Sequence, residues 1–438
     1  MKKYISAGDM TGSTDSERII AAIDIALKEG VRAVRIPRRN GRGDEVWVID
    51  RTIELPSDIE IFIDDAHLVL ATGGYLNMFS AIADFGPEGS EKSSALRNIY
   101  IHGSGRATLD GGEYNGLSER NFKERGIDIY RNTSMLFFNV DGLRVENISV
   151  INQRWWGITN IFVSNAVFRN IYFDADFSRI DENGVHHPDE KPITGNEVYV
   201  KNADGIDLRI GCHHVLIENI TGFTEDDSVA LTALGTGEMN RGMFVKGEET
   251  AIHDVRIKNV VTDCYCSNVR LLNGNGHRLY NIELDGIASL LSDKRTQDNP
   301  FSARNSATVR IGDVAYTRDY PGFDDVRNIT VRNIFSETNC AITVCNAVSG
   351  FTVENVIAKA GYAAIGTYRR YFLDSAEGEN FASGYNLSCE AVEVGSPVPT
   401  TVYYVNYRAK IKDFTYSNVA TLSPETETVQ LKYIDVVD

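Results

Sequence analysis

The chain has 438 residues, 42% of them hydrophobic, and carries a formal net charge of −17. This acidic balance argues against nucleic acid as a partner, because phosphate binding requires a basic surface. The sequence contains no run of about 18 apolar residues, so it predicts no membrane span.

The first 45 residues are expected to form an N-terminal cap. Residues 1–9 have a basic start but no apolar segment, so no signal peptide is predicted and we expect a cytoplasmic protein. Residues 15–27 show an N-capped amphipathic pattern that stops before Gly30, which predicts a helix, and residues 33–37 predict a short strand. Such a helix would cover the open end of a solenoid.

After the cap, one pattern recurs: a short run of alternating β-branched residues, an asparagine and another apolar residue. The asparagines of this pattern are Asn147, Asn170, Asn219, Asn259, Asn281, Asn333 and Asn355. Neighbouring members are 22 or 23 residues apart in three cases (147 to 170, 259 to 281, 333 to 355). A period in this range indicates a repeat architecture, and short β-rich runs without long helices favour a β-solenoid.

The sequence therefore predicts one all-β domain over residues 1–438, a single-stranded right-handed parallel β-helix. We expect the cap over 1–45, the coils over 46–370, and irregular last coils with a second cap over 371–438. An asparagine at the same turn of every coil can stack on its neighbours and satisfy buried polar groups, so we expect a structural ladder.

Polar insertions interrupt the coil rhythm at residues 113–134, 176–197, 233–250 and 289–306. On a solenoid, insertions tend to gather on one face, which is often the binding face.

The cysteines are expected to be reduced thiols, because no signal peptide is predicted that would send the chain to an oxidising compartment. They are Cys212, Cys264, Cys266, Cys340, Cys345 and Cys389. Their spacing is not that of a zinc site, so we predict no metal and no cofactor.

Three aspartates stand out because of their spacing. Asp204 and Asp226 are 22 residues apart, which is one coil period. Strands of stacked coils lie about 4.8 Å apart, so we expect these two carboxylates to be neighbours, with Asp227 beside them. Clustered carboxylates raise the pKa of at least one member, which provides an acid and a base at neutral pH. For Asp204 alone, an ordinary Asp-Gly turn remains the alternative.

Two arginines and three aromatic residues are candidates for substrate binding. Arg270 is 44 residues beyond Asp226, which predicts the same phase two coils on, where a cation would bind a substrate carboxylate. A plain surface charge is the alternative. Arg310 repeats the local pattern around Arg270. The aromatic candidates, which would either stack on sugar rings or belong to the core, are Trp155, Trp156 and Tyr265.

These motifs resemble those of glycoside hydrolase family 28, the polygalacturonases. Residues 202–207, Asn-Ala-Asp-Gly-Ile-Asp, are similar to the family's Asn-Thr-Asp-Gly motif, and Glu225-Asp226-Asp227 is similar to its Gly-Asp-Asp motif. Residues 269–272, Val-Arg-Leu-Leu, resemble its Arg-Ile-Lys motif, and residues 101–112 resemble a coil common in pectin-active β-helices. The resemblance covers roughly residues 10–360 and implies the pectin-lyase-like fold.

The resemblance also implies roles for individual residues. Asp226 would be the general acid of an inverting hydrolase, while Asp204 and Asp227 would hold and activate the attacking water. Asn202 would join the substrate-binding residues. The family's Gly-His-Gly motif has no counterpart in residues 241–248, and Leu272 stands where the Arg-Ile-Lys motif has lysine. The histidines that would approach the site from loops are His186, His187, His213, His214 and His277.

The first hypothesis is therefore a glycoside hydrolase, exo-acting, on pectic or related uronic-acid-containing oligosaccharides or polysaccharides. The second is a polysaccharide lyase or uronate epimerase on the same scaffold, with Arg270 or Arg310 as the base. The third is a non-catalytic glycan-binding β-helix. Fold alone does not separate them, because function depends on the site. A homo-oligomer is compatible with all three.

Overall fold

The computed structural model describes residues 3–112, 130, 132–153, 155–175, 203–235, 240, 242–291, 307–313, 317, 320–367, 382–386, 390–394, 401–405 and 408–438. Asn202, His186, His187 and Cys389 lie outside these residues. The chain divides into two compact units. Unit 1 comprises Met1–Glu190, Glu197–Asp226 and Thr236–Glu249, and unit 2 comprises Lys191–Asn196, Asp227–Gly235 and Thr250–Asp438. Within the described residues, no helix is long and apolar enough to cross a membrane.

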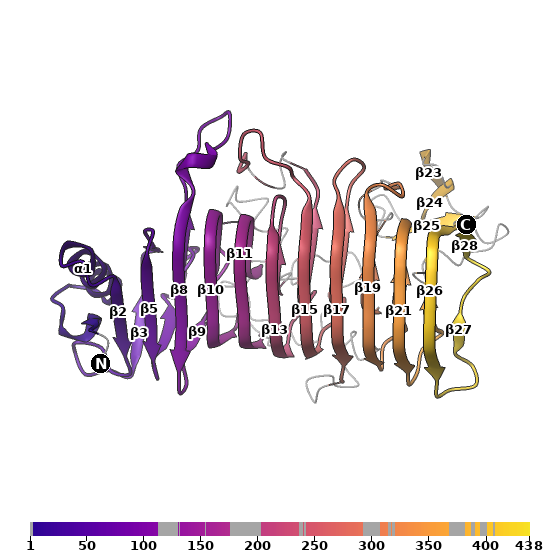
Figure 1. The fold of residues 1–438 in the computed structure, drawn as a ribbon. Coiled ribbons are helices and arrows are strands. Elements are labelled where there is room, and N and C mark those ends of the chain that lie inside the picture. The colour runs from indigo at the N-terminus through magenta and orange to yellow at the C-terminus, as the bar shows by residue number, and fades with distance from the viewer. Residues whose placement is uncertain are drawn as a thin grey trace. The chain divides into compact units, whose positions relative to one another are not determined.

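Unit 1 is built from strands and, in its described part, one α-helix, α1 (Figure 1). Its helical elements are η1 (Ala7–Asp9), α1 (Asp15–Lys28) and η2 (Lys92–Ser94). Its strands are β1 (Ile5–Ser6), β2 (Ala33–Pro37), β3 (Val46–Ile49), β4 (Ile53–Glu54), β5 (Ile59–Asp64), β6 (His67–Leu70), β7 (Phe79–Ile82), β8 (Leu96–Ser104), β9 (Thr108–Asp110), β10 (Met135–Ile151), β11 (Trp156–Asp174), β12 (Asp204–Leu208) and β13 (His213–Phe223).

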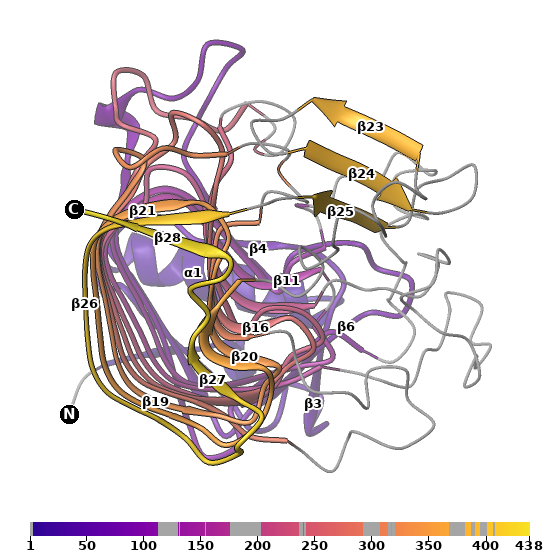
Figure 2. The same ribbon diagram turned by 90° about the vertical axis from the view of Figure 1, so that its right-hand side faces the viewer.

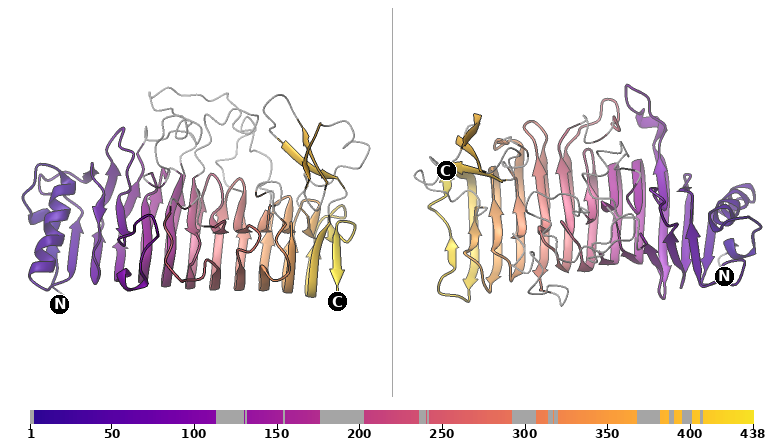
Figure 3. Two further views of the ribbon diagram at one scale, coloured as in Figure 1. Left: turned by 90° about the horizontal axis from the view of Figure 1, so that it is seen from above. Right: turned by 180° about the vertical axis from the view of Figure 1, so that it is seen from behind.

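The predicted N-terminal helix is present. The Thr14 hydroxyl accepts a hydrogen bond from the Glu17 amide at 3.3 Å, which caps the first turn of α1. Four apolar residues on one face of the helix are buried, namely Ile19, Ala22, Ile23 and Ala26. Helix α1 packs on the first strands of unit 1, beside β2 (Figure 3). Parallel pairing already begins between β1 and β2, within the residues expected to form the cap.

The strands of unit 1 stack in parallel on three faces of the coil. One face contains β4, β7, β10, β11 and β12, the second contains β1, β2, β5, β8, β10, β11 and β13, and the third contains β3, β6, β9, β10, β11 and β13. Strands β10 and β11 belong to all three faces because each continues around the corners of its coil. Buried aliphatic and aromatic residues line the interior of each coil. The predicted right-handed parallel β-helix is confirmed.

Unit 2 has the same kind of architecture. Its strands are β14 (Val229–Ala233), β15 (Ile252–Asp263), β16 (Ser267–Asn273), β17 (Leu279–Ser289), β18 (Ala307–Ile311), β19 (Val326–Ser336), β20 (Cys340–Val344), β21 (Ala347–Ala358), β22 (Ala363–Gly366), β23 (Ala382–Asn386), β24 (Glu390–Val394), β25 (Thr401–Val405), β26 (Ala409–Thr421), β27 (Glu427–Val429) and β28 (Ile434–Val437). Strands β14, β16, β18, β20, β22 and β27 form one parallel stack, and β15, β17, β19, β21, β26 and β28 form another. Strands β26 to β28 close the last coil, which Figure 2 shows along the stack. Strands β23 to β25 pair antiparallel.

The expected asparagine ladder is present in both units. In unit 1, Asn219 donates to Asn170, and Asn170 donates to Asn147, both at 2.8 Å. In unit 2, Asn355 bonds to Asn333 at 3.0 Å. These asparagines have φ between 54° and 59°, a left-handed conformation that asparagine adopts more readily than other side-chain-bearing residues. The ladder therefore holds the same corner of successive coils.

One predicted step of the ladder is wrong. Val260 pairs with Ile287, so this coil is 27 residues long (287 − 260) and not 22. Extra residues in the turn before β17 lengthen it. Asn281 consequently belongs to a second ladder, in which it bonds to Asp254 at 3.0 Å and accepts from Asn328 at 3.2 Å.

Four of the described cysteines are buried, and Cys212 and Cys340 are among them. Burial raises the pKa of Cys212 to about 12 and also raises the pKa of Cys340, so both stay protonated at neutral pH.

Candidate active site

In unit 1, Asp204 and Asp226 lie on successive coils at the same corner. Asp204 begins β12 and pairs with Trp156 of β11. The amides of Glu225 and Asp226 both donate to the Ala203 carbonyl, at 3.1 and 3.4 Å, which places Asp226 next to the start of β12. Asp204 is 5% exposed, whereas Asp226 is half-buried and in partial contact with solvent.

Neighbouring side chains fix the backbone at this corner. The Glu225 carboxylate accepts from the Ala203 amide at 3.3 Å, and the Thr224 hydroxyl donates to the Asp226 carbonyl at 3.1 Å. From the sequence, Glu225 was recognised only as part of the Glu225-Asp226-Asp227 motif. Its structural contribution is to clamp one coil to the preceding one.

In unit 2, Asp227 forms an ion pair with Arg270. Arg270 Nη1 donates to Asp227 Oδ2 at 3.1 Å, and the two side chains are 12% and 1% exposed. Burial by itself would lower the pKa of Arg270, but Asp227, Cys266 and Asp313 together more than offset it, and the pKa lies above its ordinary value. The guanidinium is therefore a permanent cation.

The predicted phase of Arg270 is wrong. Ala230 of β14 pairs directly with Arg270 of β16, so one coil and not two separates them. The polar insertion at 233–250 lengthens this coil to 40 residues (270 − 230), so a count of 44 does not equal two coil periods. Being only one coil away, the Arg270 side chain reaches back to Asp227.

Arg310 lies directly opposite Arg270 on the next coil of unit 2. Its guanidinium donates to the carboxylate of Asp313 and, at 3.3 Å, to Cys266 Sγ. Asp313 Oδ2 also approaches Arg270 Nη2, at 3.5 Å. Two cations that would repel each other on neighbouring coils are thus bridged by a shared carboxylate.

Asp313 was not among the site residues predicted from the sequence. The available signal was its place in the run Val309-Arg310-Ile311-Gly312-Asp313. This run matches the first two residues of the Arg-Ile-Lys motif, whereas residues 269–272 match only the arginine. Four side chains of unit 2 therefore form one alternating network, Asp227–Arg270–Asp313–Arg310.

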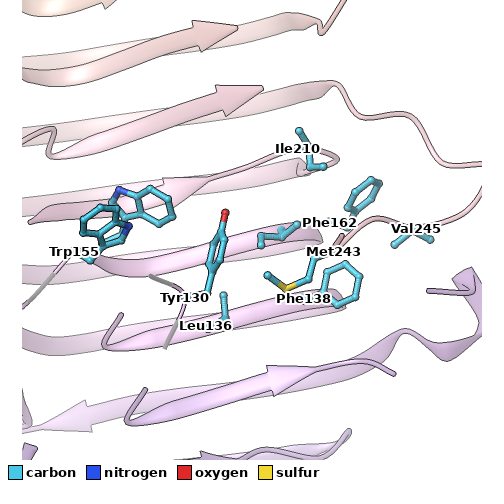
Figure 4. Close-up of a cluster of buried hydrophobic side chains, with 10 residues drawn as sticks. Tyr130, Leu136, Phe138, Trp155, Phe162, Ile210, Met243 and Val245 are labelled. Atoms are coloured by element: carbon cyan, nitrogen blue, oxygen red, sulfur yellow. The ribbon is translucent and has the colours of Figure 1, made fainter. Parts of the chain in front are cut away.

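The aromatic candidates occupy different environments. Trp155 and Trp156 are each 3% exposed and belong to a buried cluster in unit 1 (Figure 4). Their rings lie 5.7 Å apart, and the Tyr130 ring meets Trp156 edge-on at 5.4 Å. This packing favours a core role for both tryptophans. Tyr265 is half-buried on the turn before β16 of unit 2.

Three of the histidines expected to approach the site are described, His213, His214 and His277. In unit 1, His213 and His214 begin β13, where His213 pairs with Ser164 of β11, and their Nδ1 atoms are 2.8 Å apart. In unit 2, His277 Nδ1 lies 3.3 Å from the Thr250 hydroxyl.

Comparisons with known proteins place the fold. No protein-family model matches the chain, and no curated protein matches it. Among solved structures, it is similar to an exopolygalacturonase from Thermotoga maritima, with a TM-score of 0.52 and 17% identity over 82% of this chain and 88% of that one. It is also similar to a polygalacturonase from Erwinia carotovora ssp. carotovora, with a TM-score of 0.55 and 13% identity over 100% and 97% of the two chains. At this identity the likeness establishes the parallel β-helix and nothing finer.

Proposed function

We propose that this protein is an inverting glycoside hydrolase that acts from the chain end on pectic or related uronic-acid-containing oligosaccharides. The observation that carries the proposal is the corner of unit 1, where Asp204 and Asp226 lie on successive coils. Asp227, the next residue in the sequence, is ion-paired with Arg270. Carboxylates on both sides of a glycosidic bond are what its hydrolysis requires.

The environments of the aspartates suggest their roles. Asp226 is the most exposed of the three, so its carboxyl group can reach the leaving oxygen and act as the general acid. Asp227 is buried in an ion pair and is a hydrogen-bond acceptor, which suits it to hold the attacking water. Asp204, also buried, would share that task.

The charge state of Arg270 weakens the lyase and epimerase alternatives. A base that removes the proton at C5 of a uronate must first lose its own proton. The raised pKa of Arg270 opposes that loss, so Arg270 serves better as a fixed cation.

The two similar solved structures add fold-level support for a polysaccharide substrate. One protein is an exopolygalacturonase and the other a polygalacturonase. Because one scaffold hosts many activities, this support is an analogy at the level of the fold, and the proposal depends on Asp204, Asp226 and Asp227.

The proposal is tested with the wild type and Asp226→Asn on a panel of pectic oligosaccharides. We expect reducing-sugar release to fall by a factor of about 10² to 10⁴ in the variant, because the proton donor is lost. Proton NMR of the first product should show the inverted anomer. Asp24→Asn, an exposed change on α1, is the matched control and should behave as wild type.

Two results would contradict the proposal. Turnover by Asp226→Asn within threefold of wild type would remove Asp226 from the mechanism. Absorbance of an unsaturated product in the ultraviolet, without water incorporation, would identify a lyase.

A further inference from the structure

One buried arginine of unit 1 has a hydrogen-bonding edge that the described chain does not use. The Arg209 side chain, just beyond the end of β12, is 3% exposed. Its Nη1 lies 3.7 Å from Asp207 Oδ1, and its Cζ lies 4.2 Å from the ring centroid of Trp156. Within the described residues, Nε and Nη2 have no hydrogen-bond partner.

This unused edge has a specific chemistry. Buried donors on a charged group are costly to leave unsatisfied, so an arginine in this state calls for a partner. The Nε and Nη2 hydrogens point in parallel and match the two oxygens of a carboxylate. Asp207 approaches Nη1 and leaves that edge open, while the indole of Trp156 supports the guanidinium plane.

A second side chain in the same region is also unsatisfied. Gln153 is 0% exposed, and neither its Oε1 nor its Nε2 has a hydrogen-bond partner within the described residues. It lies three residues before Trp156, at the corner that leads into β11. A buried primary amide with both ends available can accept from one sugar hydroxyl and donate to another.

The position of these groups relates them to the catalytic proposal. Arg209 directly follows β12, the strand that Asp204 begins, and its guanidinium lies over the indole of Trp156, which pairs with Asp204 from the neighbouring coil. Both Gln153 and Arg209 belong to unit 1, as does Asp204. A sugar bound by them would be held next to the bond to be cleaved.

We propose that Arg209 binds the carboxylate of a uronic acid residue of the substrate through Nε and Nη2, and that Gln153 binds hydroxyl groups of the same sugar. This inference rests on the proposed function and adds the residue that selects an acidic over a neutral sugar. Trp156 is a positioning residue that holds the guanidinium in plane.

The test measures binding in the Asp226→Asn background, so that the ligand is not consumed. Isothermal titration compares a trisaccharide of galacturonic acid with its fully methyl-esterified form. We expect the ratio of the two affinities, acid over ester, to fall at least tenfold when Arg209→Gln is added. Arg209→Lys, which keeps the charge but loses the planar fork, should give an intermediate ratio.

Replacing Arg209 alone would also leave the buried Asp207 carboxylate without a neighbouring positive charge, which would lower the stability of the fold. The double change Asp207→Asn with Arg209→Gln removes both charges together and should retain the wild-type circular dichroism spectrum. It should show the same loss of acid preference as Arg209→Gln.

An affinity ratio that changes less than threefold in these variants would overturn the assignment of Arg209, as would the absence of any acid preference in Asp226→Asn. Hydrolysis by the wild-type protein is measured separately on neutral and acidic oligosaccharides. Hydrolysis without acid preference rejects only the role of Arg209, whereas no hydrolysis of any oligosaccharide rejects the proposed function itself.

Discussion

Replacing Asp313 by asparagine tests the buried charge network of unit 2. In the network, the charges of Arg270 and Arg310 are balanced by those of Asp227 and Asp313, and no member is more than 12% exposed. Asp313→Asn leaves a net charge of +1 in this buried region. Removing one partner of a buried ion pair costs about 3 to 5 kcal/mol, because the remaining charge is uncompensated. We expect the free energy of unfolding to fall by about that amount.

The assay is urea unfolding followed by far-ultraviolet circular dichroism, with the free energy taken from the midpoint and slope. The matched control is Asp435→Asn, which breaks the ion pair between Arg408 and Asp435. Those side chains are 43% and 39% exposed, so the control should lose less than about 1 kcal/mol.

A double-mutant cycle separates charge imbalance from lost packing. Arg310→Met together with Asp313→Asn leaves Arg270 balanced by Asp227, and should recover a substantial part of the stability lost in Asp313→Asn alone. If Asp313→Asn costs no more than the exposed control, the network does not balance buried charge and the reasoning is refuted.

Changes at three further residues test other parts of the fold. Asn170→Ala should cost about 1 to 2 kcal/mol, and Asn170→Gly less, because glycine loses the ladder bonds but keeps the left-handed conformation; urea unfolding ranks the two. Thr14→Ala should cost about 1 kcal/mol by removing the cap of α1, and an unchanged unfolding midpoint would contradict this. Burial would raise the pKa of Asp110, but hydrogen bonds, the largest from His67, lower it below its ordinary value. Ionised Asp110 therefore adds stability that is lost as the pH falls below about 4. Asp110→Asn should flatten that loss in unfolding curves recorded between neutral and acid pH.

The local features of the fold could be predicted from the sequence because they depend on neighbouring residues. The amphipathic pattern before Gly30 predicted α1, and the repeated asparagines predicted the ladder. The corner of each coil requires a left-handed backbone conformation, and asparagine adopts it more readily than most residues. The repeated asparagines therefore mark the corners, and the coil period can be read from the sequence.

The phase of distant residues could not be predicted in the same way. Counting in steps of 22 fails wherever a turn holds extra residues, which is why Asn281 was assigned to the wrong ladder and Arg270 to the wrong coil. Side-chain partners are also invisible to counting. Asp313 is recognised only once both arginines that share it are in place, and the open edge of Arg209 only once its burial is known.

The helix at the start of the chain has a consequence for self-association. The outermost strand of any β-solenoid presents unpaired backbone donors and acceptors, which another strand of the same sequence can extend into a fibre. In unit 1, α1 packs on the first strands with its apolar face buried, and the backbone groups in the middle of a helix are already bonded to one another. The 14 residues of α1 thus block the first strands of one molecule from pairing with strands of another molecule.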